Sequence, residues 1–227
     1  METSIVRTVL ALVMFAGASW LDLRSRRVAN RYWFPFITAA AVFVIGDLLS
    51  PPQGWLVAYG AAAAATALLY GMWHLGSFGG ADAKGLMVVA WLAPFAVNGF
   101  FPPVLDMMVN ATTLLFAMPI LLGIWNLSHG RVVGPAMLLG TPMAIDAAEA
   151  RFVWPMQRVK DGKTKWRYWH RPGEAIAPVY EALRNAGVTT VWTTPKIPFM
   201  VPLFVGLAVH LRYGNLLLPV LERWLAP

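Results

Sequence analysis

The sequence predicts an all-α polytopic membrane protein with six transmembrane helices and a small α+β cytoplasmic insert before the last helix. Of its 227 residues, 58% are hydrophobic and only 13% are charged, whereas a soluble domain carries about 25% charged residues. Apolar stretches of membrane-spanning length recur along the chain, and the segment before the last of them is polar and basic. These observations favour a membrane bundle with one modest soluble insert.

Six apolar stretches are long enough to cross a bilayer, because a transmembrane helix needs about 20 residues. Pro51-Pro52 and Pro102-Pro103 lie in two of the connections, where we expect helices to stop. We therefore expect a five-helix membrane region over 1–127, an insert over 128–196, and a last helix with a C-terminal tail over 197–227. The predicted spans are 4–22, 32–49, 55–75, 84–101, 108–127 and 197–217.

The distribution of basic residues predicts the orientation in the plasma membrane. Four arginines lie between the first two spans, and residues 128–196 carry ten basic residues. Because cytoplasmic loops are enriched in Lys and Arg, the N-terminus is expected outside and the loops at 24–31, 82–84 and 128–196 inside. The first stretch also has features of a cleavable signal peptide. Its heavier basic cluster follows the apolar run, however, which favours a retained span.

The insert is expected to contain a hairpin and a short helix. Asp161-Gly162 is a typical hairpin turn, and the flanking segments 152–159 and 164–169 are expected to form strands. Residues 174–185 are expected to form a helix, with Gly187 past its end. Segment 151–169 mixes Trp and Tyr with Lys and Arg. In a membrane protein this mixture favours a surface close to the lipid bilayer over a nucleic-acid site.

Two aspartates, Asp22 and Asp82, stand at the ends of apolar stretches on the predicted cytoplasmic side. A carboxylate at membrane depth costs about 2.5–3.5 kcal/mol or more, so each is a candidate functional residue. Asp22 alone could be an interfacial anion paired with Arg24 or Arg26, and Asp82 alone could cap a helix. Together they suggest a carboxylate pair that shares one proton and activates water.

The residues available limit the chemistry to such a pair. The chain has no cysteine and only four scattered histidines, so thiol nucleophiles and cysteine-type metal sites are excluded. We expect neither a metal nor a cofactor. One carboxylate would take a proton from water, and the protonated one would donate a hydrogen bond to the developing oxyanion.

Three segments, in this order along the chain, carry a resemblance to a known family. The chain resembles an archaeal preflagellin peptidase or type IV prepilin peptidase of the GxGD family of membrane aspartyl proteases. The segments are 22–30 (DLRSRRVAN), 79–84 (GGADAK) and 192–198 (WTTPKIP). The resemblance covers essentially the whole chain, although the insert is weakly matched.

The resemblance implies a site and a substrate class. Asp22 and Asp82 would be catalytic, while Gly79, Gly80, Ala81 and Lys84 would form the loop that binds substrate. Ala81 departs from the family motif, which has glycine there, and this puts the loop conformation in doubt because alanine disfavours positive φ. The substrates would be preflagellin-like or prepilin-like precursors with a short basic leader. The cysteine-rich region that accompanies N-methylation is missing, so cleavage alone is expected.

Two other function classes fit parts of the pattern. A transporter or proton channel could use Asp22 and Asp82 as an ion relay, although repeated halves and polar residues at mid-bilayer are not visible. A non-catalytic membrane scaffold could dock partners through the insert. The protease hypothesis also makes a structural prediction: the helices that carry the two aspartates should be adjacent, so that the carboxylates can approach within water-bridging distance.

Overall fold

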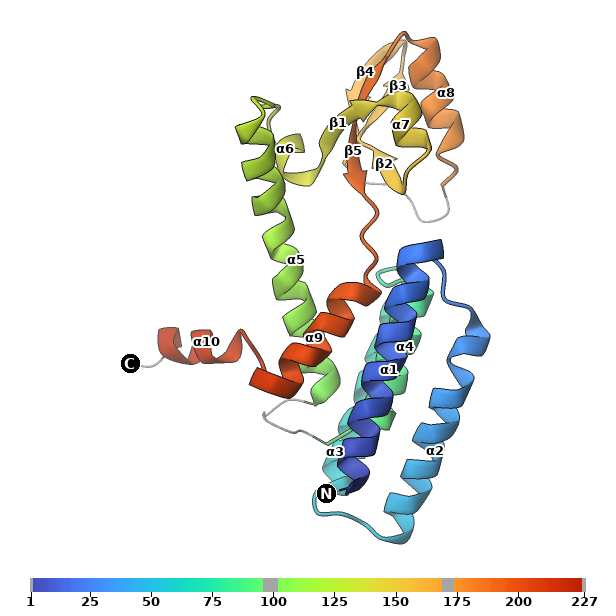
Figure 1. Ribbon diagram of the computed structural model, residues 1–227, viewed down its shortest axis with the longest axis vertical. Coiled ribbons are helices and arrows are strands. Elements are labelled where there is room, and N and C mark those ends of the chain that lie inside the picture. The colour runs from blue at the N-terminus through green and yellow to red at the C-terminus, as the bar shows by residue number, and fades with distance from the viewer. Residues whose placement is uncertain (1, 96–101, 169–173, 226–227) are drawn as a thin grey trace. The chain divides into compact units, whose positions relative to one another are not determined.

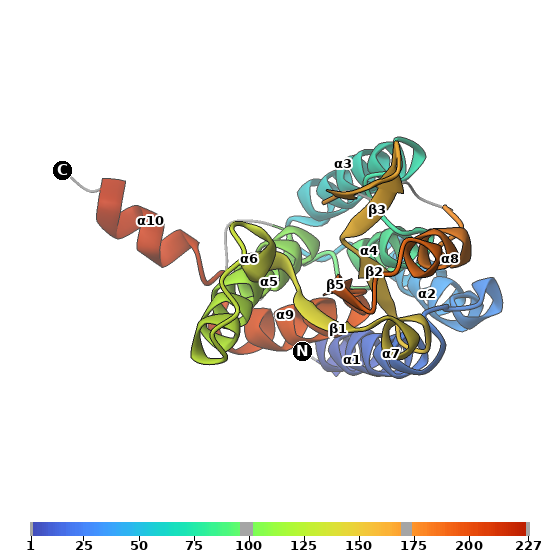
Figure 2. The ribbon, with the colours of Figure 1, turned by 90° about the horizontal axis from the view of Figure 1, so that it is seen from above.

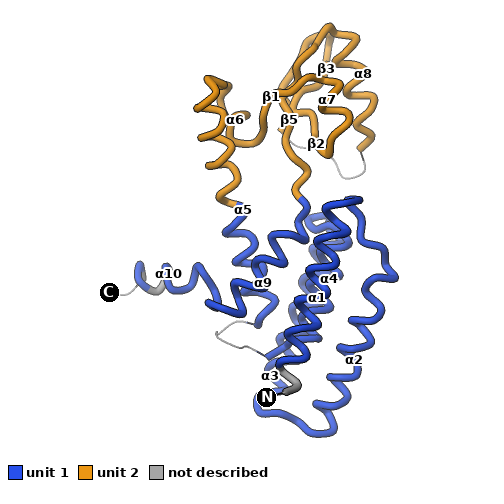
Figure 3. Tube along the Cα trace, viewed as in Figure 1, with its two compact units in different colours: residues 1–115, 198–227 blue, residues 116–197 orange. Residues whose placement is uncertain are grey.

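The computed structural model describes residues 2–95, 102–168 and 174–225 (Figure 1). The chain divides into two compact units, which Figure 3 colours separately. Unit 1 comprises residues 1–115 and 198–227, and unit 2 comprises residues 116–197. The described residues are mostly helical, and the strands among them lie between residues 141 and 195.

Within the described residues, four helices are long and apolar enough to cross a membrane. Each coincides with a predicted span, so the apolar runs identified these helices correctly. They are α1 (Glu2–Ser25), α2 (Phe34–Leu49), α3 (Trp55–His74) and α5 (Pro103–Ser128). The short 3-10 helix η1 (Asn30–Tyr32) precedes α2.

The two other predicted spans correspond to shorter helices. Helix α4 (Gly80–Leu92) has 13 residues and α9 (Met200–Tyr213) has 14. Helix α4 ends because Ala93 precedes Pro94, and the residue before a proline is driven out of the helical region; Ala93 has φ −133° and ψ 67°. Helix α9 ends at Gly214, with φ 74°. Part of the predicted span 84–101 lies outside the described residues, and six spans stay a prediction.

Helix α4 packs against α1, α2 and α3 in unit 1 (Figure 2). Its centre is closely packed, because a Cβ atom on Gly85 would lie 3.1 Å from Trp33 and 3.3 Å from Phe15. Trp33 and Phe15 are both fully buried. A glycine at this position therefore lets α4 lie close to α1, which confirms that the helices carrying the two aspartates are adjacent.

Helix α9 packs along α1 and also touches the first part of α5. A Cβ on Gly206 would lie 2.5 Å from the backbone oxygen of Met107 and 2.9 Å from the amide of Ala111. Such close backbone approach through a small residue is typical of membrane helix pairs. The short amphipathic helix α10 (Leu218–Leu225) follows α9, in the segment predicted only as a tail.

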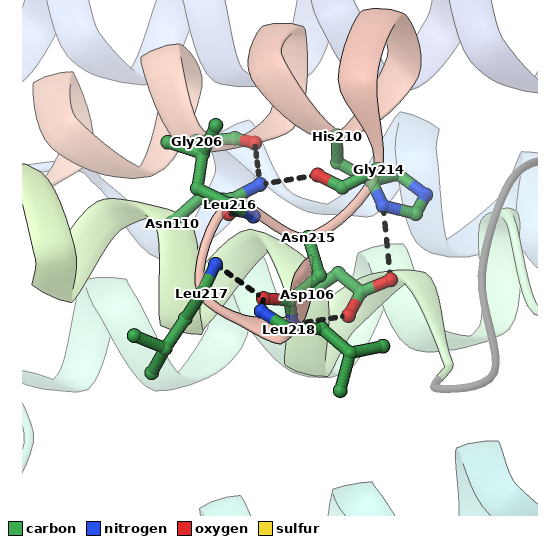
Figure 4. A network of polar contacts seen from close by, with 9 residues as sticks. All are labelled: Asp106, Asn110, Gly206, His210, Gly214, Asn215, Leu216, Leu217 and Leu218. Atoms are coloured by element: carbon green, nitrogen blue, oxygen red, sulfur yellow. Dashed lines mark hydrogen bonds and ion pairs between the residues drawn. The ribbon is translucent and has the colours of Figure 1, made fainter. Parts of the chain in front are cut away.

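Buried polar groups tie the helices of unit 1 together. Arg7 of α1 forms an ion pair with Asp47 of α2 at 2.6 Å, and Tyr59 of α3 donates a hydrogen bond to the same carboxylate at 2.6 Å. A second network joins α5 to α9 (Figure 4), where Nδ1 of His210 lies 3.2 Å from the carboxylate of Asp106. The contacts of Arg7, Asp47 and Tyr59 avoid the cost of unpaired polar atoms in lipid, whereas the buried Nε2 atom of His210 has no hydrogen-bond partner among the described residues.

Unit 2 contains a three-stranded antiparallel sheet with strand order β1-β5-β2. Its strands are β1 (Thr141–Ala144), β5 (Thr190–Pro195) and β2 (Val153–Pro155), and its helices are α6 (Ala136–Leu139), α7 (Ile145–Glu149) and α8 (Ala177–Asn185). The apolar core of this unit includes Tyr180, Leu183 and Val191. Burial, with a smaller contribution from the charge of Glu149, raises the pKa of Tyr180 to about 12, so this phenol packs as a neutral group.

The predicted hairpin is present as a two-stranded antiparallel ribbon, β3 (Gln157–Lys160) and β4 (Lys163–Trp166). Its turn residues Asp161 and Gly162 have φ 55° and 69°. A two-residue hairpin turn of type I′ requires positive φ at both of these positions. The predicted strand 152–159 is divided in two, because the amide of Met156 donates to the oxygen of Trp192 and interrupts the run. Helix α8 begins at Ala177 and not at residue 174.

Candidate active site

Asp22 lies in the last two turns of α1, beside the first residue of α9. The backbone N–H of Met200 donates a hydrogen bond to the Asp22 carboxylate at 3.3 Å. One turn earlier, the buried hydroxyl of Ser19 donates to the backbone oxygen of Met200 at 2.8 Å. The positive charge of Arg26 also acts on the Asp22 carboxylate. The start of α9 therefore holds this carboxylate in place.

Asp82 lies in the first turn of α4, three residues after the N-cap Gly79. Its carboxylate folds back over that glycine, since a Cβ built on Gly79 would lie 2.5 Å from the Oδ2 atom of Asp82. The space that glycine leaves is therefore filled by the Asp82 carboxylate.

The two carboxylates act on one another electrostatically, and the negative charge of Asp22 opposes ionisation of Asp82. This interaction joins two residues 60 positions apart in the sequence. Like charges that interact favour a state in which only one of the two is ionised. The predicted pair is thus close enough for its members to influence each other.

The other predicted loop residues take distinct positions. A Cβ on Gly80 would lie 3.2 Å from the indole nitrogen of Trp73, so this glycine lets α4 approach α3. Gly79 itself has φ −63°. Neither glycine is among the described residues with positive φ, so close packing is what requires a glycine at these two positions. Ala81 lies in the first turn of α4, outside the positive-φ region, and packs on the main core without conflict.

Lys84 connects the two aspartate-bearing segments. Its Nζ atom donates a hydrogen bond to the side-chain oxygen of Asn30 at 2.7 Å and lies 5.6 Å from the ring centre of Trp73. Asn30 ends the segment that begins with Asp22, and Lys84 ends the segment that contains Asp82. The interaction therefore ties the connection after α1 to the first turns of α4.

Sequence reasoning missed two contributors, Ser19 and Met200. Ser19 is a single small polar residue in an apolar run, and Met200 contributes only its backbone. A main-chain contact across 178 positions leaves no residue-type signal. Segment 192–198, one of the three segments that carry the family resemblance, leads directly to Met200. Its presence in the resemblance was the one sequence signal that the start of α9 belongs to the site.

One cavity in unit 1 does not include either aspartate among its lining residues. It has a volume of about 700 Å³ and runs between α2 and α4, with Lys84 and Asn30 among its lining residues. On α4 it is lined by Lys84, Val88 and Trp91. Asp82 is two residues before Lys84, about 200° around the helix, so the two side chains leave α4 on different faces. Neither aspartate lines this cavity.

Three acidic side chains of unit 2 are paired with arginines of the same unit. Arg184 contacts Asp146 at 2.9 Å and Glu149 at 2.7 Å. Arg167 pairs with Glu174 through both of its terminal nitrogens.

Comparison with known families identifies the chain. The model of the type IV leader peptidase family matches residues 9–127, more than half of the protein, including both aspartate segments. The chain belongs to the type IV leader peptidase family. The model of the archaeal peptidase A24 C-terminus, type II, matches residues 135–216. No curated protein matches the chain.

The two matches together indicate the class of enzyme to which the leader peptidase belongs. It is an archaeal protease of the preflagellin and prepilin peptidase type, and its apolar helices are those of a membrane protein. The first match contains Asp22 and Asp82. The second contains Met200, whose amide reaches Asp22. Both matched regions thus contribute to the candidate site.

Proposed function

We propose that this leader peptidase is an intramembrane aspartyl endopeptidase in which Asp22 and Asp82 form the catalytic dyad. It removes the short basic leader from preflagellin-like and prepilin-like precursors at the cytoplasmic membrane border. The observation that carries the proposal is the packing of α1 against α4, the two helices that carry Asp22 and Asp82, so that the charge of Asp22 acts on Asp82. Coupled titratable groups of this kind are typical of functional sites.

The surroundings of the two carboxylates support different roles. Asp22 accepts the Met200 hydrogen bond and faces the charge of Arg26, and both interactions stabilise a negative carboxylate. Asp82 has no such donor among its described contacts and is opposed by the charge of Asp22. Asp22 is therefore the base, and Asp82 is the protonated partner.

Peptide hydrolysis follows from these roles. Asp22 takes a proton from water while the water oxygen bonds to the scissile carbonyl carbon, and Asp82 donates its proton to the oxyanion. When the tetrahedral intermediate collapses, the C–N bond breaks, the leaving nitrogen takes the proton held by Asp22, and the hydroxyl proton returns to Asp82. Both carboxyls end in their starting states.

The proposal also specifies the orientation of the enzyme in the membrane and limits its activity to cleavage. The basic residues between α1 and α2 support an N-terminus outside the cell and a dyad near the cytoplasmic face. That height suits a cut between a basic leader and a hydrophobic segment. The enzyme cleaves without N-methylation, because the chain has no cysteine with which to build the zinc region that accompanies methylation in relatives.

The test is cleavage of a panel of basic-leader precursors by the full chain in liposomes, read by mass spectrometry. Asp22→Asn and Asp82→Asn should each lower the rate by at least about a hundredfold, the range expected for loss of general acid–base catalysis. Asp161→Asn is the matched control, because Asp161 is an exposed turn residue and asparagine tolerates its positive φ.

Three results would decide between the function classes. Loss of cutting in both dyad variants, with the control active and thermal unfolding unchanged, supports the protease. Cutting that survives both substitutions overturns the dyad. No cutting by the wild-type chain, together with proton flux that depends on Asp22 and Asp82, would favour a transporter.

A further inference from the structure

The ribbon β3–β4 in unit 2 has an unusual pairing of charges. In its register, Arg158 lies opposite Lys165, and Lys160 lies opposite Lys163. Paired residues point to the same side of a ribbon, and side chains alternate between the two sides along each strand. All four cations therefore project from one face, which we call the basic ribbon face.

The opposite face of the ribbon is the one that anchors it to unit 2. Val159 packs against the apolar core, and Trp166 lies 6.1 Å from Trp192 of β5, measured between ring centres. Gln157 accepts a hydrogen bond from the backbone N–H of Trp192 at 3.1 Å. Since that face is occupied, the basic ribbon face points outward, and its four cations are all exposed.

Little within the chain neutralises this face. Lys165 contacts the exposed carboxylate of Asp161 at 3.0 Å. In the described part of the chain, Arg158, Lys160 and Lys163 form no ion pair. Like charges directly opposite each other destabilise an antiparallel ribbon. An arrangement that places two such pairs on one face therefore lowers stability unless an external anion binds there.

We propose that the basic ribbon face binds the anionic headgroups of membrane phospholipids. Unit 2 is joined at both ends to apolar helices, α5 and α9, so the ribbon is tethered near a bilayer at high effective concentration. Clustered lysines and arginines close to a membrane are attracted to anionic lipids.

The experiment uses the full chain in lipid nanodiscs. Because the protein has no cysteine, Thr164→Cys introduces a single labelling site at an exposed position of β4, on the face opposite the four cations, so the label does not cover the basic ribbon face. A fluorophore at position 164 is quenched by headgroup-attached quenchers when the ribbon lies on the bilayer. Quenching should be strong in discs with about 30% phosphatidylglycerol and weak in pure phosphatidylcholine, and it should fall between about 50 and 500 mM salt, where screening shortens from about 14 to about 4 Å.

Matched charge variants show which residues are responsible. In the labelled chain, Lys160→Gln with Lys163→Gln should reduce the ratio of bound to free ribbon about fivefold per lysine, the factor expected for a basic residue near an anionic surface. Arg131→Gln with Arg151→Gln removes the same charge elsewhere in unit 2 and should leave quenching unchanged. Thermal unfolding should not worsen in the lysine variant, because like-charge repulsion is removed.

Other occupants give different results. Inorganic phosphate that releases the ribbon from anionic discs, when chloride at equal ionic strength does not, would indicate a phosphate site and overturn the lipid assignment. Equal quenching in neutral and anionic discs would overturn it as well. So would an equal loss in both charge variants, because net charge alone would then explain the attraction.

Discussion

The amine of Lys84 donates a hydrogen bond to the side-chain oxygen of Asn30 over 2.7 Å, and this contact joins the segments that carry Asp22 and Asp82. It connects the start of η1 to the second turn of α4 across 54 positions. The Lys84–Asn30 pair is partly open to solvent, so it positions the two segments more than it stabilises the fold. Its effect should therefore appear in cleavage before it appears in unfolding.

Lys84→Met and Asn30→Ala should each lower kcat/KM about threefold to tenfold, as expected when a hydrogen bond of about 1 kcal/mol that orients the site is lost. The double variant should be no worse than either single one, because both remove the same interaction. Arg31→Met, a neighbouring exposed cation, is the control and should cleave normally. Additive losses in the double variant would show that the two residues act separately.

Gly79→Ala should damage cleavage much more than stability. The added Cβ would lie 2.5 Å from the Asp82 carboxylate, so that side chain has to move. A displacement of about 1 Å at a reacting group costs about a hundredfold in rate. Gly71→Ala is the control, because a Cβ on this helical glycine meets nothing within 4 Å. Steady-state cleavage and thermal unfolding of both variants test this, and a fully active Gly79→Ala would contradict the placement of Asp82.

Ser19→Ala should loosen the start of α9. The variant loses the buried hydrogen bond from Ser19 to the oxygen of Met200, which costs about 1–3 kcal/mol of unfolding free energy when the acceptor stays unpaired. Because the amide of Met200 contacts Asp22, the pH profile of cleavage should shift as well. Ser25→Ala removes an exposed hydroxyl that bonds within its own segment and should change neither quantity. An unchanged profile would show that α9 does not position Asp22.

Asp106→Leu should destabilise the bundle without a direct effect on catalysis. Asp106 is fully buried, accepts a hydrogen bond from the half-buried Asn215 at 2.7 Å and lies 3.2 Å from the buried His210, so its removal takes a partner from both side chains. Breaking a buried pair costs about 3–5 kcal/mol. Thermal unfolding in detergent should show this loss, and Asp106→Asn should retain part of the stability. A stable Asp106→Leu protein that cannot cleave would instead place Asp106 in the catalytic machinery.

Local patterns predicted the local elements well. The long apolar runs identified α1, α2, α3 and α5, and the Asp161-Gly162 dipeptide identified the turn of the ribbon. These features depend on neighbouring residues alone, because a helix satisfies its own backbone and a tight turn depends on its own dihedral angles. The two candidate aspartates were recognisable for a similar reason, since charge is rare in such a chain.

Elements that depend on distant partners were not predictable in the same way. Strands β1 and β5 were missed because each is a short run that becomes a strand only by pairing with the other, about 50 positions away. The predicted strand 152–159 was divided for the same reason, since the amide of Met156 bonds to Trp192. The predicted span 84–101 was longer than α4, because Pro94 ends the helix although the apolar pattern continues.

The sequence by itself determined that this chain is a membrane protein, which residues could carry chemistry, and where the ribbon turns. Only the tertiary structure decided that Asp22 meets the amide of Met200, that Gly79 makes room for the Asp82 carboxylate, and that Lys84 reaches Asn30. The difference is physical. Composition and periodicity act between near neighbours, whereas a site is assembled by backbone and side-chain contacts whose partners are chosen by the packing of the whole bundle.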